Sequence, residues 1–197
     1  MRRREKTDGN KETDMEGEAG AKQLRERLLN AQKILVGIGM EWDPKTPERK
    51  AKITTAAETR RRLLSGRDYY VITSLEEEGA LALGIEKEHM AAPFCVSFTE
   101  EDWKNYTAWL AGTLNRNLVL LELGEDFKNP SLIRWPFEKT AMLNQKAVLF
   151  RVHKSLSQIP DTLKEKAVSI AADSVEFLLA CGITEEKDEQ EGTNGCD

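Results

Sequence analysis

LVLLELG, residues 118–124, is the stretch that decides the fold, because five of its first six residues are apolar and a glycine ends it. A run that is apolar on both faces is typical of a strand in a parallel sheet with helices on both sides. Thr99, followed by three acids, predicts a helix start before this strand. A second helical pattern, over residues 132–143, follows it. The stretch is therefore predicted to be a buried strand between two helices.

Further outward, the same alternation of apolar runs and helical patterns covers most of the chain. Helix starts are predicted at Thr46-Pro47, for a helix reaching Leu64, and at Asp173, for a helix ending at Gly182. A first helix is expected from about residue 20 to 30. The other expected strands are at residues 34–36, 69–73, 147–152 and 164–170. Strands separated by long helical patterns predict an α/β fold, a doubly wound, Rossmann-like parallel sheet with helices on both faces.

The 197 residues suffice for one domain. We expect a disordered N-terminal tail over 1–17, a single Rossmann-like domain over 18–183 without a zinc ribbon, and an acidic disordered tail over 184–197. The tails are predicted from polar composition without apolar periodicity.

Charge and composition exclude several classes of function. The net charge of −5 argues against a nucleic-acid partner, which usually meets a basic stripe. No apolar run is long enough for a membrane span, and none follows the N-terminal arginines as in a secretory signal. We therefore expect a cytoplasmic protein without a membrane partner. The three cysteines show no CxxC spacing, so no zinc or other metal site is expected.

Ligands of doubly wound sheets bind beyond the carboxyl ends of the strands, where the strand order switches. This rule selects three strand ends, at residues 37–41, 73–77 and 124–130. Gly37 and Gly39 allow backbone amides to approach a phosphate, but an ordinary tight turn explains them equally well.

The loop over 124–130 and the last helix start leave similar alternatives open. Asn129-Pro130 is a turn signal in a loop that either holds a ribose hydroxyl or caps the following helix. Asp173 and Ser174 either form a helix cap, which we favour from the residues alone, or face an adenine edge.

The two histidines also leave alternatives. His153 either bonds a nucleotide at the end of its strand or lies in an exposed loop. His89 has no neighbour in sequence that would make it a general base, so it is a weak catalytic candidate.

The segment LVLLELGEDFKNPSLIRWPFEK, residues 118–139, resembles the sirtuins, in particular the microbial branch linked to macrodomains and protein ADP-ribosylation. ILVGIGM, residues 34–40, is similar to the first strand and glycine loop of that family. YYVITSLEEEGALALG, residues 69–84, is similar to the strand and helix that carry T-x-N-x-D. The last two strands, over residues 147–177, match as well. The resemblance covers about residues 21–181 and implies an NAD-binding Rossmann-like core.

Departures from the family pattern fall on positions for which the resemblance implies catalytic roles. The first loop has Met40 and Glu41 in place of small residues, and an acid there would repel a pyrophosphate. Leu75 stands at the Asn position and Glu77 near the Asp position. Phe94 stands near the general base and cannot accept a proton. The resemblance therefore implies that the adenosine half of the site survives better than the nicotinamide half.

Three functions follow as expectations. The first is a sirtuin-like protein, impaired in catalysis, that binds NAD, ADP-ribose or a related adenosine nucleotide. The second is an active NAD-dependent ADP-ribosyltransferase or deacylase, with His89 as a repositioned base. The third is a structural or interaction domain without a ligand, whose protein partner the sequence does not name. The candidate nucleotide contacts are Gly37, Gly39, Gly124, Asn129, His153, Asp173 and Ser174.

Overall fold

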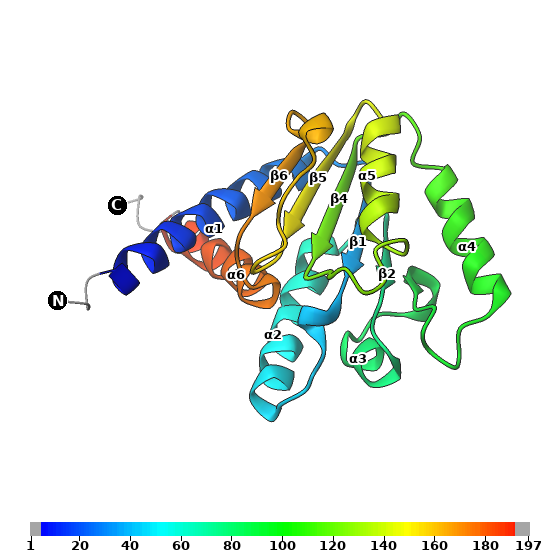
Figure 1. The fold of residues 1–197 in the computed structure, drawn as a ribbon, viewed down its shortest axis with the longest axis horizontal. Helices are drawn as coiled ribbons and strands as arrows, with labels where there is room; N and C mark the ends of the chain where they lie inside the picture. Colours follow the sequence, from blue (N-terminus) through cyan, green and yellow to red (C-terminus); the bar gives the residue numbers. More distant parts are fainter. Residues whose placement is uncertain (1–4, 192–197) are drawn as a thin grey trace, which may run out of the picture.

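The computed structural model describes the backbone of residues 5–191 and the side chains of residues 17–182. Its centre is a sheet in which every strand pair is parallel (Figure 1). The strands run in the order β3-β2-β1-β4-β5-β6, so the order reverses between β1 and β4. Their bounds are β1 Lys33–Ile38, β2 Tyr69–Thr73, β3 Met90–Ala91, β4 Leu118–Leu123, β5 Ala147–Val152 and β6 Ala167–Ile170.

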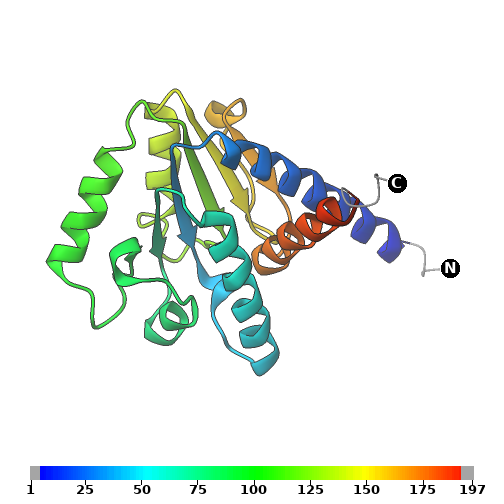
Figure 2. The same ribbon diagram turned by 180° about the vertical axis from the view of Figure 1, so that it is seen from behind.

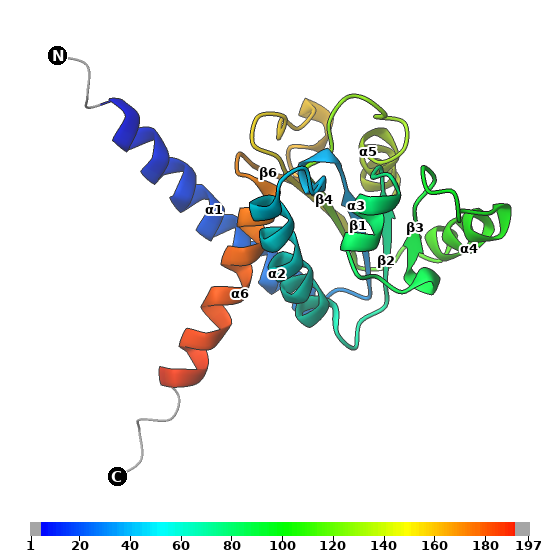
Figure 3. The same ribbon diagram turned by 90° about the horizontal axis from the view of Figure 1, so that it is seen from below.

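Helices cover both faces of this sheet, which confirms the predicted doubly wound architecture. One face carries α1, α2 and α6, and the other carries α4 and α5, as Figures 2 and 3 show. The helix bounds are α1 Glu5–Leu29, α2 Pro47–Leu64, α3 Glu77–Ala82, α4 Glu100–Ala111, α5 Arg134–Leu143 and α6 Ser174–Glu191. Short 3-10 turns are η1 Met40–Trp42, η2 Lys87–His89 and η3 Asp161–Leu163.

Strand β4 supplies both layers of the core, as its sequence predicts. Val119, Leu121 and Leu123 pack into the layer under α1, α2 and α6. Leu118 and Leu120 pack into the layer under α4 and α5. All six residues of the strand are buried, because alternate side chains of a central parallel strand face opposite helical layers.

The predicted helix starts at Thr46 and Thr99 are confirmed by their hydrogen bonds. The Thr46 hydroxyl accepts a hydrogen bond from the Arg49 amide. Thr99 and Asp102 form a reciprocal capping box, in which each side chain accepts from the other residue's backbone amide. Such caps satisfy amides that have no partner inside the helix.

Both terminal helices are longer than the sequence pattern predicts. Helix α1 begins at Glu5 rather than near Gly20, and so runs through most of the segment expected to be irregular. Once a packed segment has nucleated a helix, further turns need no apolar residues. Residues 1–4 and 192–197 of the expected tails lie outside the described residues, and the division into domain and tails stays a prediction.

Gly182 does not end the last helix, which continues to Glu191. A methyl group added at Gly182 would lie 3.0 Å from Oγ1 of Thr59 on α2. The glycine therefore serves close packing between α6 and α2 rather than helix termination. Strand β3, only two residues long, is a further element that the sequence pattern does not predict.

Candidate functional site

A cavity of about 580 Å³ opens at the edge where the strands end. Figure 3 looks at this edge from below the view of Figure 1. All three predicted strand ends contribute to its lining: Met40 follows β1, Leu75 and Glu77 follow β2, and Lys128 follows β4. The cavity therefore lies at the switch in strand order, where ligands of such sheets bind.

The cavity wall is polar and apolar in similar parts and carries charges of both signs. Its acids are Asp43, Glu76, Glu77 and Glu78, and its bases are Lys45 and Lys128. Lys45 is largely exposed, and its Nζ lies 3.4 Å from Oδ2 of Asp43 in an ion pair. Carboxylates accept hydrogen bonds from hydroxyl groups, as a ribose presents them. The wall therefore offers both acceptors for hydroxyl groups and ammonium groups, with carboxylates in excess.

Leu75, Glu77 and Phe94, the three positions that the resemblance links to catalysis, line this one cavity. Leu75 is buried, whereas Phe94 is half exposed. The Glu77 carboxylate accepts a hydrogen bond of 3.0 Å from the Val96 amide, which ties α3 to the loop that carries Phe94. Of the three side chains, only Glu77 can exchange a proton.

Gly37 contacts a helix and not the cavity. A methyl group on this residue would lie 2.9 Å from Cζ of Phe137 and would collide with Ile133. The missing side chain thus lets α5 approach β1 closely.

Gly39 and Gly124 are covered by two carboxylate side chains of the protein. A methyl group on Gly39 would collide with Glu125, both backbone and carboxylate. Gly124 has a φ of +67°, which favours glycine. A methyl group there would lie 2.5 Å from Cβ of Glu41 and 2.6 Å from Oγ of Ser174. The space that a phosphate would need beside both glycines is therefore filled.

The Glu41 carboxylate bridges two loops at the ends of β5 and β6. Its Oε1 accepts a hydrogen bond of 3.0 Å from the Lys154 amide. Its Oε2 accepts one of 2.9 Å from the amide of Ser174, the first residue of α6. The positive end of a helix dipole favours an anion at this place.

Asp173 acts as the N-cap of α6, the interpretation favoured from the residues alone. Its Oδ1 accepts hydrogen bonds from the amides of Val175 and Glu176, at 3.0 and 3.2 Å. Its two oxygens also accept hydrogen bonds from Nη1 of Arg49, each at 3.0 Å. The carboxylate is therefore committed to partners within the protein.

Ser174 is fully buried beneath Trp42. Its hydroxyl accepts a hydrogen bond of 3.1 Å from Nε1 of the indole, which is itself fully buried. Of the candidate contacts in the adenosine half, Ser174, Asp173 and Gly124 thus all have partners within the protein. The cavity lies instead beside Leu75, Glu77 and Phe94, in the half that the resemblance links to nicotinamide. The resemblance implies the opposite, namely that the adenosine half survives better.

His153 is buried just after the end of β5. Its hydrogen bonds show that the imidazole is neutral. Nδ1 accepts from the amides of Ser155 and Leu156, each at 3.0 Å, so this nitrogen carries no proton. Burial lowers the pKa of His153. The 3.5 Å approach of Nδ1 to Glu41 is therefore no ion pair at neutral pH.

Asn129 is exposed, and its backbone carbonyl accepts a hydrogen bond of 3.0 Å from the Leu132 amide. This bond forms the turn before α5, in agreement with the turn signal. The alternative, a contact of its side chain with a ribose, stays a prediction.

His89 lies at the opposite edge of the sheet from the candidate site. Its ring stacks on Tyr69, with centroids 4.6 Å apart, and Nδ1 lies 3.1 Å from the Tyr69 carbonyl oxygen. Tyr69 is the first residue of β2 and pairs with Ile34, five residues before Gly39. At about 3.3 Å per residue, this places the ring roughly 16 Å from the strand ends. In this arrangement, His89 is not positioned as a base for the cavity.

Glu125 is a residue of the site that sequence reasoning did not single out. The side chain is fully buried and Oε2 accepts a hydrogen bond of 2.6 Å from the Ser74 hydroxyl. Oε1 has no hydrogen-bond partner among the described residues. Burial raises the pKa of Glu125 to about 7, although the Ser74 hydrogen bond acts in the opposite direction. An acid directly after the glycine of a buried strand is the signal that could have identified it.

The loops of the site are anchored by a buried ion network under α5. Glu122 accepts hydrogen bonds from Arg151 at 2.8 and 2.9 Å and from Arg134 at 3.3 Å. Arg134 also donates to the Leu156 carbonyl at 2.7 Å, and so ties the loop after β5 to α5. Arg151 is further paired with Glu138 at 2.9 Å. Much of the IRWPFE motif is thus used for buried structural contacts.

No group of three or more histidine, cysteine or acidic side chains with metal-binding geometry occurs among the described residues. Within the same residues, no helix has the length and apolar character that crossing a membrane requires.

The comparisons with known proteins do not extend this description. No model of a known protein family matches the chain. No curated protein matches its sequence either. What the structure itself shows is the fold class: a Rossmann-like α/β fold with a six-stranded parallel sheet in the order 3-2-1-4-5-6.

Proposed function

We propose that this protein binds an ADP-ribose-type nucleotide at the carboxyl edge of its sheet and is impaired in cleaving NAD. One observation carries the proposal: the three strand ends around the β1/β4 switch line a single cavity of about 580 Å³. This volume lies in the range of small-molecule sites, and the location follows the general rule for open α/β sheets. The sirtuin resemblance of residues 118–139 adds the choice of ligand.

The wall of the cavity supports a phosphorylated ligand with sugar hydroxyls. Lys128, together with Lys45 in place of its contact with Asp43, would bind phosphate oxygens, and Glu77 and its neighbours would accept hydrogen bonds from ribose. The adenosine half would extend toward Asp173 and Ser174, where Glu41 and Trp42 lie in the structure.

Impaired catalysis follows from the side chains at the catalytic positions of the resemblance. Leu75 and Phe94 can neither orient a water molecule nor accept a proton. General acid–base help contributes about 10²–10⁴-fold to a rate, and orientation contributes further. We therefore expect no measurable nicotinamide release from NAD, with or without acylated peptides.

Titration calorimetry tests the binding. ADP-ribose and NAD should bind, adenosine should bind more weakly, and Lys128→Ala should weaken ADP-ribose binding about fivefold, as expected for one lost charge contact. Lys146→Ala, an exposed lysine just before β5, removes the same charge at the other edge and should have no effect. Absence of binding with all three ligands would favour the structural or interaction domain instead.

An assay of nicotinamide release tests the second part. Release by the wild-type protein would contradict impaired catalysis. Loss of that release in Glu77→Gln would identify Glu77 as the base, and loss in His89→Ala would require a rearrangement that brings His89 to the cavity.

A further inference from the structure

Exposed apolar side chains gather on the helical layer that α4 and α5 form. Among residues 17–182, ten large apolar side chains are well exposed, and five of them belong to α4, α5 and the turn after α4. These five are Trp103, Leu114, Trp135, Met142 and Leu143. Because water disfavours apolar surface, such a concentration on one layer marks a site of interaction.

A groove of about 440 Å³ lies between the C-terminal ends of these two helices. Its wall is largely apolar and contains leucines from both sides: Leu110, Leu114 and Leu143. Asn144, buried at the end of α5, donates hydrogen bonds to the carbonyl oxygens of Thr113 at 3.0 Å and Arg116 at 3.1 Å. These bonds tie the end of α5 to the turn after α4, so the groove is a formed feature of the fold.

The α4 side of this groove carries a stripe whose spacing reads the same in both directions. Its residues follow at intervals of four, three and four positions: Trp103, Thr107, Leu110 and Leu114. Such intervals place side chains on one face of a helix, and the last three residues line the groove. When the stripe is reversed against a second copy, Trp103 meets Leu114 and Thr107 meets Leu110. A two-fold axis generates this antiparallel match.

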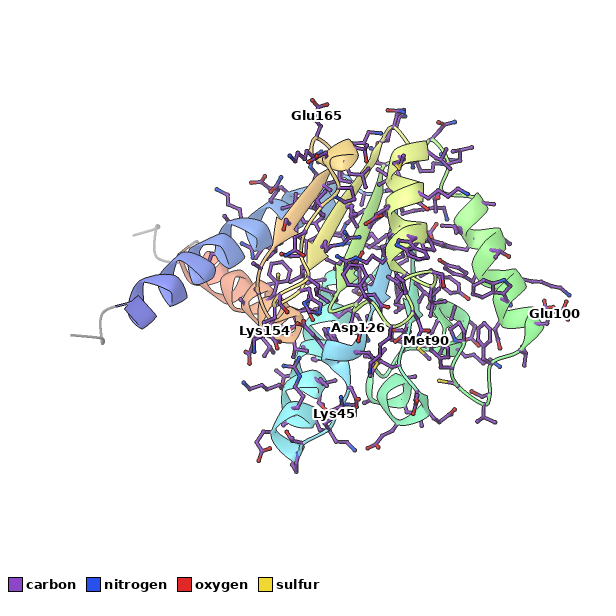
Figure 4. The ribbon with its side chains drawn as sticks, viewed as in Figure 1. Lys45, Met90, Glu100, Asp126, Lys154 and Glu165 are labelled. Atoms are coloured by element: carbon purple, nitrogen blue, oxygen red, sulfur yellow. The ribbon has the colours of Figure 1, made fainter. Side chains whose placement is uncertain are left out.

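The two ends of the same segment carry opposite charges. Helix α4 begins with Glu100 and Glu101, and Arg116 follows its last turn. Figure 4 shows Glu100 at the end of α4 that lies away from α5. The reversal that brings Trp103 to Leu114 also brings Glu101 of one copy to Arg116 of the other. A parallel arrangement would bring like charges together, so the charges favour the antiparallel one.

We propose that the groove between α4 and α5 is the interface of a two-fold symmetric homodimer, in which α4 packs antiparallel against α4 of a second copy. The occupant is a second copy because the stripe and the charges at its ends each complement their own reversal. The groove lies beside the starts of β4 and β5, whereas the candidate nucleotide cavity lies at the carboxyl edge. The inference therefore does not depend on the proposed nucleotide binding.

Aspartate substitutions place a charge in the groove from either side. Leu114 and Leu143 are 60% and 65% exposed, so Leu114→Asp and Leu143→Asp should leave the monomer folded. Each should raise the dissociation constant of the dimer at least about 30-fold, as for the loss of a central apolar contact. Leu29→Asp is the matched control. Leu29, the last residue of α1 on the other layer, is 75% exposed, and its substitution should leave association unchanged.

Charge reversal tests the antiparallel arrangement. Glu101→Arg and Arg116→Glu should each weaken association about tenfold, because like charges then meet at both ends of the interface. The variant with both substitutions exchanges the two charges, so its affinity should return to within about threefold of the wild-type value.

Sedimentation velocity over a series of protein concentrations measures association of the full chain. The wild-type protein should sediment as a dimer at micromolar concentration. Thermal unfolding shows whether each variant is folded, and Leu114→Ser or Leu143→Ser serves for the comparison if an aspartate variant is not.

Each other outcome counts against the inference. A wild-type protein that stays monomeric throughout the series overturns it, and so does a dimer that both aspartate variants leave intact. Dissociation of Leu29→Asp to the same extent as the groove variants would show general apolar association and overturn the interface. A double charge variant that does not regain affinity would overturn the antiparallel arrangement.

Discussion

The carboxyl edge of the sheet has two halves that meet at β1, and they differ in what fills them. Beyond β1, β2 and β3 lies the open cavity of about 580 Å³, which reaches Lys128 in the loop after β4. Beyond β4, β5 and β6, the corresponding space holds Glu41 and the buried indole of Trp42. Residues 40–42 separate the two halves. Met40 lines the cavity of the open half, whereas Glu41 and Trp42 fill the closed half. The end of a strand thus marks where a ligand can bind, but the side chains decide whether it finds room.

If the closed half is part of the core, its largest side chain should contribute most to stability. Trp42→Ala should lower the free energy of unfolding by roughly 3–5 kcal/mol, as for other buried aromatic residues. Urea unfolding measures the change. Trp42→Phe, which loses only part of the volume and the hydrogen bond to Ser174, should cost less than half as much. A loss below about 1 kcal/mol for the alanine variant would place Trp42 outside the core.

Glu125 should give the closed half a characteristic dependence on pH. Its folded-state pKa, raised from 4.5 to about 7, means that the folded state binds a proton more tightly than the unfolded state. The resulting contribution is fully present below pH 4.5 and is lost as the pH rises through 7, by about 3 kcal/mol in total. Glu125→Gln does not titrate, so the difference in unfolding free energy between wild type and variant should change by this amount.

Comparison with the variant is needed because the lowered pKa of His153 acts in the opposite direction in part of the same range. Ser74→Ala provides a second control. It removes a hydrogen bond that lowers the pKa of Glu125, so the stability loss should extend to higher pH. A constant difference between wild type and Glu125→Gln from pH 4.5 to 7 would show that folding does not raise the pKa of Glu125.

Asp173, in the closed half, should have a smaller effect on stability. Asp173→Ala removes the cap of α6 and should cost about 1–2 kcal/mol in unfolding free energy, measured in urea. Asp173→Asn keeps a capping oxygen and should cost less. The resemblance predicts that Asp173→Ala weakens ADP-ribose binding more than Glu77→Ala does. The reverse order would mean that the open half contributes most of the affinity.

The smallest effect on stability is expected in the open half. Phe94 is half exposed, and Phe94→Ala should change the free energy of unfolding by less than about 0.5 kcal/mol. The same variant should alter ADP-ribose affinity, which calorimetry detects. A large destabilisation together with unchanged affinity would make Phe94 a core residue and remove the distinction between the halves.

The sequence predicts the parts of the fold that depend on local patterns. Strands β2, β4 and β5 coincide with apolar runs at the predicted residues, and Thr46 and Thr99 cap helices as expected. The three strand ends that line the cavity also follow, because parallel strands end at a common edge.

What the sequence does not predict depends on contacts between distant residues. A glycine at a strand end is compatible with a phosphate or with a neighbouring side chain. Only the structure shows that Glu125 covers Gly39 and Glu41 covers Gly124. In the same way, Gly182 suggests a helix end until Thr59 is seen beside it.

The position of β1 at the centre of the sheet also determines the order in which the protein can assemble. Its residue Lys33 pairs with Leu118, which lies far along the chain. During synthesis, β1 and β2 are complete long before β4, and until then one edge of β1 has unpaired backbone groups. Closing such a long loop costs entropy before any contact is gained, which slows the folding of parallel sheets. The nascent chain therefore leaves one edge of β1 unpaired until residues 118–123 have emerged, and only then can the two halves of the sheet join.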